Sequence, residues 1–252
     1  MRALITGASS GIGRDMAILL SEMGYELILV ARTKERLESL SQELKTKTEI
    51  HVLDLSIAES CYALHKTVSE KGQPVDLLVN NAGFGTYGPF VSKNLDTELN
   101  LIDLNVRAVH ILTKLFLLDF TARDQGTILN VSSIAAFLPG PLMSSYYASK
   151  AYVQRLSEAI SEELRRQKSK VRICTLCPGP VRTGFNKRAG VRFLVDGMES
   201  RAVAAYALRK TLRGKLVIIP GWPVRLLRLS ARLAGTRLML RAVYMMQFLR
   251  RP

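Results

Sequence analysis

The sequence predicts an α/β fold, in which a doubly wound parallel sheet of about seven strands carries helices on both faces. Three observations support this prediction. Apolar runs of strand length alternate with longer segments in which apolar residues recur every three or four positions. A glycine-rich turn follows the first run directly, as it does where a parallel strand leads into a helix. No internal repeat or low-complexity linker interrupts the 252 residues, so we expect one domain.

The predicted strands are the seven apolar runs at residues 3–5, 27–30, 52–53, 77–79, 128–131, 171–174 and 216–219. Helical spacing of apolar residues predicts a helix over about 96–120, and a second long helix is predicted over 146–166. Ser56 and Glu59 have the spacing of a capping box, which predicts a helix start after the third strand. The composition changes after Gly221, so we expect a domain over 1–221 and a helical extension over 222–252.

Cysteine and histidine spacing argues against a metal site and against a disulfide framework. The cysteines are Cys61, Cys174 and Cys177, an odd number, and the close pair lacks a second pair or a nearby histidine. The three histidines are scattered, and we expect structural roles for them. The first strand begins at Arg2, which leaves no room for a signal peptide, and no stretch is apolar enough to span a bilayer. We therefore expect a cytoplasmic protein without a metal.

Positive charge gathers toward the C-terminal end. The net charge is +15, of which +1 belongs to residues 1–181 and +14 to residues 182–252. Such asymmetry predicts an electrostatic contact with phosphate groups, an anionic membrane or an acidic protein. A solubilising surface is the other interpretation. No nucleic-acid-binding module accompanies the charge, so we expect no nucleic acid partner.

The glycine-rich turn has the pattern of a dinucleotide site. Gly7, Gly11 and Gly13 permit a sharp turn, a close approach to a pyrophosphate and tight packing of the helix, and that helix attracts negative charge at its amino end. Where an NAD-binding chain has an acidic residue after the second strand, this chain has Ala31 and Arg32. The planar fork of an arginine suits a 2′-phosphate. NADP(H) is therefore the predicted cofactor; a solvated arginine at a helix start is the alternative.

Tyr146 and Lys150 form a Tyr-x-x-x-Lys pattern, which places both side chains on one face of a helix. An ammonium beside a phenol favours the phenolate and brings proton transfer closer to neutral pH. Ser133 follows the fifth strand, at the edge where α/β sheets bind ligands. The neighbours Ser132 and Tyr147 leave the choice within each pair open.

Further short motifs follow in order along the chain: Asp54-Leu55, Asn80-Asn81-Ala82-Gly83, Asn105 and Pro178-Gly179. With the glycine-rich turn, Ser133, Tyr146 and Lys150, they closely resemble the short-chain dehydrogenase/reductase family, whose fold is Rossmann-type. The resemblance covers nearly the whole chain to about Gly221. Many family members end soon after the last strand, whereas this chain continues.

The resemblance implies a role for each motif. Ser133 would polarise a substrate carbonyl, and Tyr146 would donate the proton. Lys150 would bind the nicotinamide ribose and lower the pKa of the tyrosine, and Asn105 would hold a water that connects the lysine to a proton relay. Asp54 would contact adenine and Thr183 the nicotinamide amide. The full set of implied cofactor residues is Gly7, Ser9, Ser10, Gly11, Ile12, Gly13, Arg32, Asp54, Leu55, Asn81, Ala82, Gly83, Tyr146, Lys150, Pro178, Gly179, Val181 and Thr183. Many NADPH-specific members carry a basic residue where this chain has Ser10, which leaves dual cofactor use open.

The implied function is an oxidoreductase that interconverts a carbonyl and an alcohol, and we expect a reductase because NADPH drives reduction. Apolar residues in loops near the catalytic positions predict a lipophilic ketone, aldehyde, steroid or acyl thioester. They are Phe84, Tyr87, Phe90, Phe137, Leu138, Leu142, Met143, Phe185, Phe193 and Leu194, of which we expect about half to serve local packing alone. The alternative is an NADP(H)-sensing or scaffold protein, which predicts a damaged catalytic set. The set is intact.

Two partner surfaces are predicted. The family commonly dimerises through the helices that correspond to about 96–120 and 146–166, so we expect a homodimer. In the extension, Arg225, Arg228 and Arg232 share one helical face, Leu226, Leu229 and Leu233 lie beside it, and Gly235 separates them from a second segment over 238–249. Three interpretations remain open: an anionic membrane surface contacted through 223–252, packing on the domain or on the partner subunit, and docking of an acidic carrier protein.

Overall fold

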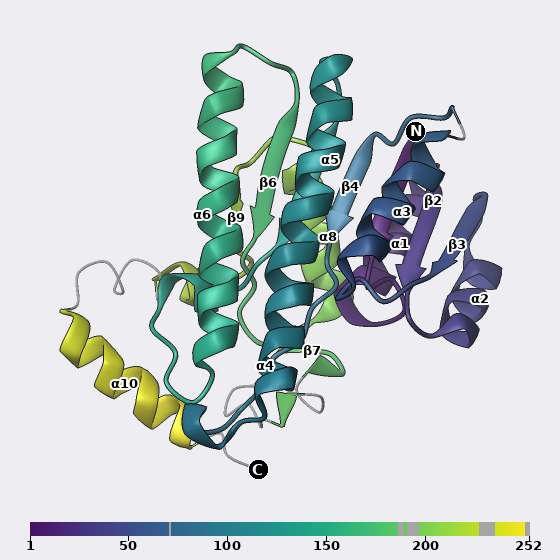
Figure 1. Ribbon diagram of the computed structural model, residues 1–252. Coiled ribbons are helices and arrows are strands. Elements are labelled where there is room, and N and C mark those ends of the chain that lie inside the picture. Colours follow the sequence, from purple (N-terminus) through teal and green to yellow (C-terminus); the bar gives the residue numbers. More distant parts are fainter. Residues whose placement is uncertain (71, 186–188, 191–196, 227–234, 250–252) are drawn as a thin grey trace.

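The computed structural model contains a seven-stranded parallel sheet with helices packed on both of its faces (Figure 1). It describes residues 1–70, 72–185, 189–190, 197–226 and 235–249. The strand order is β3-β2-β1-β4-β5-β6-β9. The predicted fold class is confirmed, including the number of strands in the main sheet.

The strands of this sheet are β1 (Arg2–Thr6), β2 (Glu26–Ala31), β3 (Thr48–Val52), β4 (Leu77–Asn80), β5 (Thr127–Val131), β6 (Arg172–Leu176) and β9 (Val217–Ile218). The helices are α1 (Gly11–Glu22), α2 (Lys34–Glu43), α3 (Ala58–Glu70), α4 (Leu95–Ile102), α5 (Val109–Ala122), α6 (Ser144–Arg166), α8 (Ser200–Thr211) and α10 (Thr236–Phe248). A π-helical stretch, Asp103–Ala108, joins α4 to α5. Two short strands that the sequence did not predict, β7 (Val181–Arg182) and β8 (Met198–Glu199), form a separate parallel pair.

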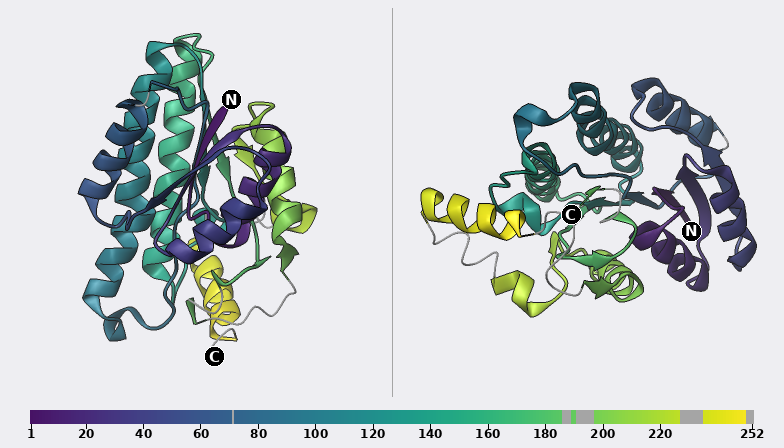
Figure 2. Two further views of the ribbon diagram at one scale, coloured as in Figure 1. Left: turned by 90° about the vertical axis from the view of Figure 1, so that its right-hand side faces the viewer. Right: turned by 90° about the horizontal axis from the view of Figure 1, so that it is seen from below.

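Alternate residues of the strands pack into two separate cores, one on each face of the sheet. Ala3 and Ile5 of β1 pack with α1, α2 and α8, whereas Leu4 packs with α3, α5 and α6. Figure 2 (left) shows these two groups of helices on opposite sides of the sheet. Burial on both faces is the reason that the strands read as unbroken apolar runs.

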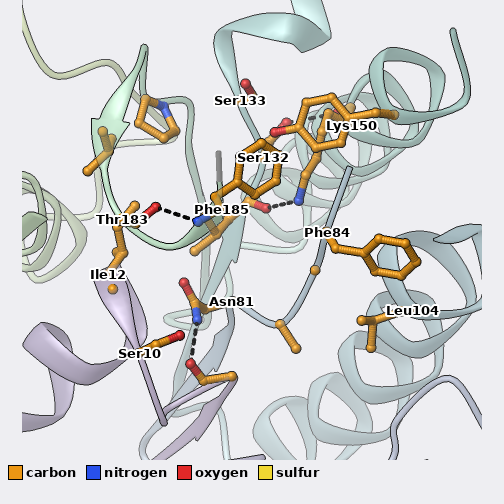
Figure 3. Close-up of a pocket in the computed structure, with 18 of the residues that line it drawn as sticks. Ser10, Ile12, Asn81, Phe84, Leu104, Ser132, Ser133, Lys150, Thr183 and Phe185 are labelled. Atoms are coloured by element: carbon orange, nitrogen blue, oxygen red, sulfur yellow. Dashed lines mark hydrogen bonds between the residues drawn. The ribbon is translucent and has the colours of Figure 1, made fainter. Parts of the chain in front are cut away.

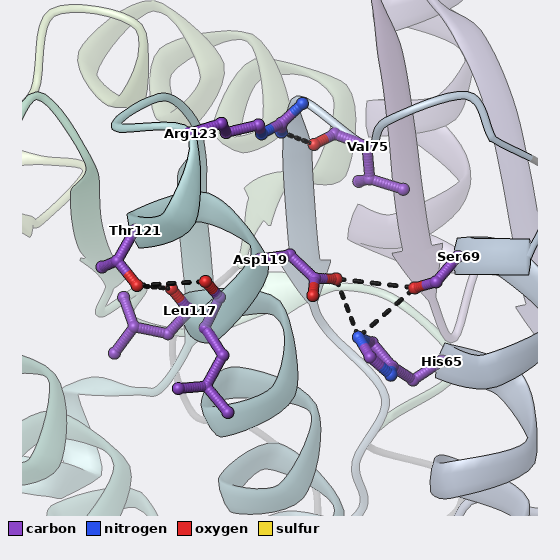
Figure 4. A network of polar contacts seen from close by, with 8 residues as sticks. His65, Ser69, Val75, Leu117, Asp119, Thr121 and Arg123 are labelled. Carbon is purple, nitrogen blue, oxygen red and sulfur yellow. Dashed lines mark hydrogen bonds and ion pairs between the residues drawn. The ribbon is translucent and has the colours of Figure 1, made fainter.

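A polar network joins α3 to α5 (Figure 4). His65 Nε2 lies 2.8 Å from Asp119 Oδ2, and the Ser69 hydroxyl donates to the same oxygen at 3.5 Å. The His65 ring also meets the Phe116 ring edge-on, with 5.0 Å between the ring centres. The other histidines have polar partners too, His51 with Glu49 and His110 with Tyr152. These contacts agree with the structural roles predicted for the histidines.

The three cysteines are free and buried, as their predicted packing roles require: Cys61, Cys174 and Cys177. Within the described part of the chain, no three histidine, cysteine, aspartate or glutamate side chains gather as metal ligands would.

The predicted capping box after β3 is wrong. α3 begins at Ala58, two residues beyond Ser56. The Ser56 hydroxyl instead donates to Asp54 Oδ1 at 2.7 Å and accepts from the Asn100 amide at 2.9 Å. The polar groups of this loop therefore hold Asp54 at the end of β3 rather than begin the helix.

The C-terminal helix α10 packs on the domain with one face. Val243 and Gln247 are buried, and Val243 belongs to an apolar cluster with Leu138, Met143 and Tyr147. The first turns of α10 extend away from the sheet (Figures 1 and 2). No helix among the described residues combines the length and the apolar character that a bilayer crossing requires.

The first predicted helix of the extension begins at residue 222, and its described part ends at residue 226. Its arginine face is only partly as predicted, because Arg225 turns toward the domain: its guanidinium donates to the Ile219 carbonyl at 3.1 Å and to the Tyr206 hydroxyl. Gly235 is the N-cap of α10, so the predicted second segment is present and begins slightly earlier. The remainder of the predicted face, Arg228, Leu229, Arg232 and Leu233, lies outside the described residues.

Candidate active site

A cavity of about 800 Å³ lies at the carboxyl ends of the strands. The chain order along the sheet reverses between β1 and β4, and open α/β sheets bind ligands in the crevice at such a reversal. All the predicted site residues line this cavity except Gly13 and Asn105. Figure 3 shows how they converge from separate elements, with Ser10 and Ile12 on one side and Ser133 and Lys150 on the other.

The turn between β1 and α1 leaves backbone N–H groups free for an anion. Gly7 and Gly11 have φ of +64° and +55°, a left-handed conformation that side chains rarely adopt. Ser10 is the N-cap of α1, yet its side chain makes no capping hydrogen bond, and the first turn of α1 contains no acidic residue. The amino end of α1 therefore has the partial positive charge of a helix start and no internal group that offsets it.

Gly13 has the packing role predicted for the glycines of this turn, and it does not line the cavity. A Cβ at this position would lie 2.4 Å from Asn81 Nδ2 and 2.5 Å from the Gly7 carbonyl oxygen. The Asn81 amide donates to the carbonyls of Thr6 and Gly7 at 2.9 and 3.2 Å, so it holds the turn after β1 against the end of β4. The third glycine of the turn thus provides space for this amide.

The rim of the cavity beside β2 and β3 carries an ion pair. Arg32 Nη1 lies 3.6 Å from Asp54 Oδ2, and Asp54 Oδ1 accepts hydrogen bonds from the Ser56 backbone and hydroxyl. Partial burial raises the pKa of Asp54, but the Ser56 hydrogen bonds and the charge of Arg32 outweigh burial and bring the pKa below its usual value. Asp54 is therefore ionised near neutral pH and can accept hydrogen bonds at this rim.

Two further residues at this rim were missed by sequence reasoning. Thr33 and Arg36 line the cavity together with Arg32, whereas Lys34 lies 3.6 Å from Glu38 and does not line it. Arg36 falls in the first turn of α2, Arg32 precedes that helix, and both line the cavity. The four-residue spacing rule of a helix does not apply to this pair, because Arg32 lies outside the helix.

Tyr146 lies at the inner end of the cavity. The Ser133 hydroxyl lies near enough to lower the pKa of Tyr146, whose ring packs beside Phe185 with 5.3 Å between ring centres. Lys150 is four residues further along α6, and its ammonium lies 5.9 Å from the centre of the Tyr146 ring. The Lys150 ammonium donates to the Val131 carbonyl at 2.9 Å (Figure 3). The predicted set of a serine, a tyrosine and a lysine is thus brought together.

Hydrogen bonds decide between the neighbouring residues that the sequence left open. The Ser132 hydroxyl donates to the Lys150 carbonyl at 2.8 Å, so it is used to hold the backbone of α6. The Tyr147 hydroxyl accepts a hydrogen bond from the Gln247 amide of α10. Ser133 and Tyr146 line the cavity; the Ser133 hydroxyl accepts from the Ala135 backbone at 3.1 Å and lowers the pKa of Tyr146.

Asn105 is buried behind the cavity rather than on its wall. Its amide donates to the Phe84 carbonyl at 2.9 Å and to the Ser149 hydroxyl at 3.1 Å, and its side-chain oxygen accepts from the Phe84 backbone at 3.1 Å. A Cβ on Gly83 would lie 2.8 Å from this oxygen and 3.4 Å from Lys150 Nζ. Asn105 therefore fixes the loop after β4, and it does so from a π-helical stretch, a feature that is frequent at functional sites.

Burial is the main influence on the pKa of Tyr146. Burial raises it to about 12, against the effect of the Ser133 hydrogen bond, and burial lowers the pKa of Lys150 to about 8. Lys150 is not among the groups that shift this pKa in the chain by itself, so the lowering that the resemblance implies stays a prediction. The lysine is buried and directs its ammonium to the Val131 carbonyl. Tyr146 consequently keeps its proton at neutral pH, which is the form that can donate one.

The cavity wall beside Tyr146 is mostly apolar. Of the ten apolar residues expected near the site, Phe84, Leu138, Met143 and Phe185 line the cavity. Phe90 is 65% exposed and does not line it. Tyr87, Phe137 and Leu142 do not line it either, and Phe193 and Leu194 lie outside the described residues. Met246 of α10 was not predicted and lines the cavity, because the fold returns the end of the chain to this wall.

The chain is similar to known proteins over most of its length. A family model described as short chain dehydrogenase matches residues 1–191. Dehydrogenase/reductase SDR family member 7 of Mus musculus is 33% identical over 222 residues, which cover 85% of this chain and 65% of that protein. The chain thus spans less than two thirds of the mouse protein. The human 17-beta-hydroxysteroid dehydrogenase type 3 is 30% identical over 239 residues, which cover 87% of this chain and 76% of the human protein.

A solved structure agrees in fold. The short-chain dehydrogenase from Sphingobium yanoikuyae in complex with NADPH superimposes with a TM-score of 0.82 and 32% identity, over 92% of this chain and 93% of that chain.

The buried lysine makes stability depend on pH. The pKa of Lys150 in the folded chain, about 8, is below the 10.5 of an ordinary lysine, so between these values the unfolded chain binds more protons. We expect the free energy of unfolding to rise with pH in this range, by on the order of 2 kcal/mol for this group between pH 8 and pH 10. Urea denaturation at a series of pH values, for the wild type and for Lys150→Met, measures the contribution as the difference between the two profiles.

The matched control is Lys45→Met, which removes an exposed lysine and should leave the profile of the wild type unchanged. Parallel profiles for the wild type and Lys150→Met would show that the buried ammonium does not titrate in this range.

Proposed function

Because the chain belongs to the short-chain dehydrogenase family of oxidoreductases, we propose that it uses NADPH to reduce the carbonyl group of a lipophilic substrate. The observation that carries the proposal is the convergence of Ser133, Tyr146 and Lys150 on the apolar end of the cavity. Two hydroxyls placed there can bind one carbonyl oxygen, and one of them can transfer a proton to it. Lys150 on the next turn of α6 completes the set.

The residues of the cavity fit a nicotinamide dinucleotide with a 2′-phosphate. The amino end of α1 offers free N–H groups to the pyrophosphate. Arg32 and Arg36 line the rim where the adenosine ribose would lie, and Ala31 replaces the acidic residue that a 2′-hydroxyl would favour. Arg32 is the residue that we assign to the 2′-phosphate, because a guanidinium pairs well with phosphate oxygens.

In the proposed reaction the bound NADPH would supply a hydride to the carbonyl carbon. The hydroxyls of Ser133 and Tyr146 would hold the carbonyl oxygen, and Tyr146 would donate its proton to that oxygen as the alcohol forms. The raised pKa of Tyr146 keeps this proton in place until the substrate binds. Lys150, held by Val131, would bind the ribose and place a positive charge near the phenolate that proton transfer leaves.

The proposed substrate is apolar and larger than a simple ketone. Leu138, Met143, Phe185 and Met246 present apolar side chains to the cavity near Tyr146. A steroid dehydrogenase and a very-long-chain 3-oxoacyl-CoA reductase are among the relatives, which supports a steroid, a long-chain ketone or an acyl thioester. Apolar walls with one polar cluster bind such molecules by burying their surface and orienting one carbonyl.

We further propose a cytoplasmic homodimer whose basic extension, 223–252, contacts an anionic surface. The free buried cysteines suit a reducing compartment.

The long helices α5 and α6 stand side by side (Figure 1), and apolar residues on their surface and on α4 remain exposed. Their exposed fractions are 48% for Leu99, 42% for Ile102, 54% for Leu118 and 41% for Tyr152. A second copy would bury them.

The first prediction tests the proton donor. Tyr146→Phe removes only the hydroxyl, so the fold and NADPH binding should survive while turnover falls by roughly two or more orders of magnitude. Steady-state NADPH oxidation with a panel of ketones, aldehydes and acyl thioesters measures the loss, and fluorescence titration measures cofactor binding. Tyr147→Phe is the matched control and should keep its activity. Near-normal turnover of Tyr146→Phe would refute the assignment, whereas absence of turnover in the wild type with every substrate of the panel would favour the sensing or scaffold alternative.

The second prediction tests the cofactor. Arg32→Ala should weaken NADPH binding by about 1.5–3 kcal/mol, the scale of a charge-assisted hydrogen bond, and leave NADH binding nearly unchanged. Lys34→Ala is the control, since Lys34 does not line the cavity. Ala31→Asp should shift the preference toward NADH. Equal losses for both cofactors in Arg32→Ala would show that Arg32 does not read the 2′-phosphate.

The third prediction tests assembly. Light scattering at micromolar concentration should give twice the chain mass of 28.0 kDa. Leu118→Arg should lower the measured mass toward one chain, because it places a charge in the proposed interface. Met23→Arg changes a similarly exposed residue, the C-cap of α1 on the other face of the sheet, and should leave the mass unchanged. An active wild-type monomer would rule out the dimer.

A further inference from the structure

The helix α10 is apolar on two sides, of which the domain covers only one. Val243 and Gln247 face the domain and are buried. On the opposite side Leu238 is 66% exposed, Met245 56% and Leu249 59%. Their spacing of seven and four residues places them in one stripe along the helix. A helix that is apolar all round is normally buried on all sides. The outer stripe of α10 is exposed instead, so its apolar side chains are available to a partner surface.

Positive charge borders the stripe. Arg237 and Arg241 are exposed on α10 beside the stripe of Leu238, Met245 and Leu249. The chain contains no aspartate or glutamate after Glu199, so no acidic residue of the same segment offsets these arginines. An apolar stripe with flanking arginines is the composition of a helix that lies in a lipid headgroup layer.

A second cationic group lies close to an exposed tryptophan. Arg209, Lys210 and Arg225 surround the Tyr206 ring, with their cations 5.6, 5.7 and 5.9 Å from its centre. No acidic partner of these three cations is found among the residues that the structure describes. Trp222, three positions before Arg225, is 71% exposed. Tryptophan favours the boundary between lipid and water, where its ring is apolar and its N–H is solvated.

These two features border the same side of the molecule. Figure 2 (right) shows α8, the turn that begins at residue 222 and α10 following one another along one margin. The hydrogen bond of Arg225 with Tyr206 fixes the turn against α8. The first turns of α10 project beyond the domain in Figure 1 and in Figure 2 (right).

We propose that the outer stripe of α10, together with Trp222 and the cations around Tyr206, is the surface by which the protein lies on an anionic membrane. The apolar stripe enters the headgroup layer, and the arginines and lysine pair with lipid phosphates. The membrane contact itself is independent of turnover, whereas the entry of a substrate from the lipid rests on the proposed function.

The charge of this face favours lipid over the other occupants. A symmetric contact between two copies would place Arg237 and Arg241 against cations of the same face, and like charges opposed across an interface repel. A small acidic protein would satisfy the cations but would not require three large apolar side chains in a projecting stripe. An anionic bilayer suits both the cations and the apolar stripe, because it offers phosphate oxygens above an apolar layer.

The inner face of α10 is the reason that this contact bears on the active site. Met246 lines the cavity, and Gln247 is tied to the domain by two contacts: its amide donates to the Tyr147 hydroxyl, and its carbonyl accepts from the Tyr87 hydroxyl at 3.1 Å. One helix therefore separates the cavity from the lipid. A lipophilic substrate would pass from the membrane into the cavity at this helix without crossing water.

Vesicle co-sedimentation of the full-length protein tests the proposal without cofactor or substrate. The wild type should sediment with vesicles of phosphatidylcholine and phosphatidylserine, remain in solution with phosphatidylcholine alone, and dissociate as salt is raised. The triple variant L238Q/M245Q/L249Q should bind at least tenfold more weakly. Arg209→Ala with Lys210→Ala should weaken binding by about fivefold for each residue, which corresponds to about 1 kcal/mol for a basic group near the surface.

Two controls match these variants in size and charge. Met23→Gln with Tyr62→Gln removes exposed apolar residues elsewhere, and Lys45→Ala with Lys47→Ala removes exposed lysines beside β3; both should sediment as the wild type does. Circular dichroism and turnover of a water-soluble ketone should be unchanged in every variant, since none of these residues lines the cavity.

Three outcomes would overturn the proposal. The first is a wild type that ignores anionic vesicles at low salt. The second is a triple variant that binds vesicles as tightly as the wild type. The third is a fall in oligomer mass for the triple variant, which would assign the stripe to a second copy. Absence of turnover with every ketone would refute the proposed function and leave the vesicle result standing.

Discussion

The attachment of α6 to the end of β5 is the constraint on which the candidate active site depends. The Lys150 ammonium donates to the Val131 carbonyl, and the Ser132 hydroxyl donates to the Lys150 carbonyl, so each element holds the other. Deeper in the core the Asn130 amide donates to the Ser157 hydroxyl at 2.9 Å. The folded chain has to satisfy all of these buried polar groups together, because each one left without a partner would lower the free energy of unfolding. They fix the rotation of α6 that presents its tyrosine to the cavity.

The same burial that fixes the geometry sets the protonation states. Removing Tyr146 and Lys150 from water disfavours their charged forms, so one pKa rises and the other falls. The chain by itself therefore holds a neutral tyrosine beside a lysine whose proton is easily lost. A cofactor that brings charge and hydroxyl groups to this place would alter both values, and the electrostatic setting of the site belongs to the complex rather than to the chain alone.

The inner face of the helix α10 contributes to the candidate active site, and its outer face is exposed and can bind a partner. Met246 reaches the cavity, while Leu238 and Met245 on the same helix are exposed. A separable membrane anchor would have no contact with the cavity, and a purely structural helix would leave no apolar stripe uncovered. A partner that binds the outer face of α10 would therefore contact the same helix that forms part of the cavity wall.

Local sequence determined the turn after β1, the Tyr-x-x-x-Lys face of α6 and all strands of the main sheet except β3, because each depends on backbone preferences and spacing within a few residues. The third strand was predicted at 52–53 and lies at Thr48–Val52, where its residues are only partly apolar. Local sequence also determined the cofactor hypothesis through Ala31 and Arg32, which are adjacent in the chain. Only the tertiary structure decided the strand order, the hydrogen bonds that occupy Ser132 and Tyr147, and the burial of Asn105 behind the cavity. It also brought Met246 to a wall formed about a hundred residues earlier. These outcomes follow from contacts between distant segments, whose partners no local pattern specifies.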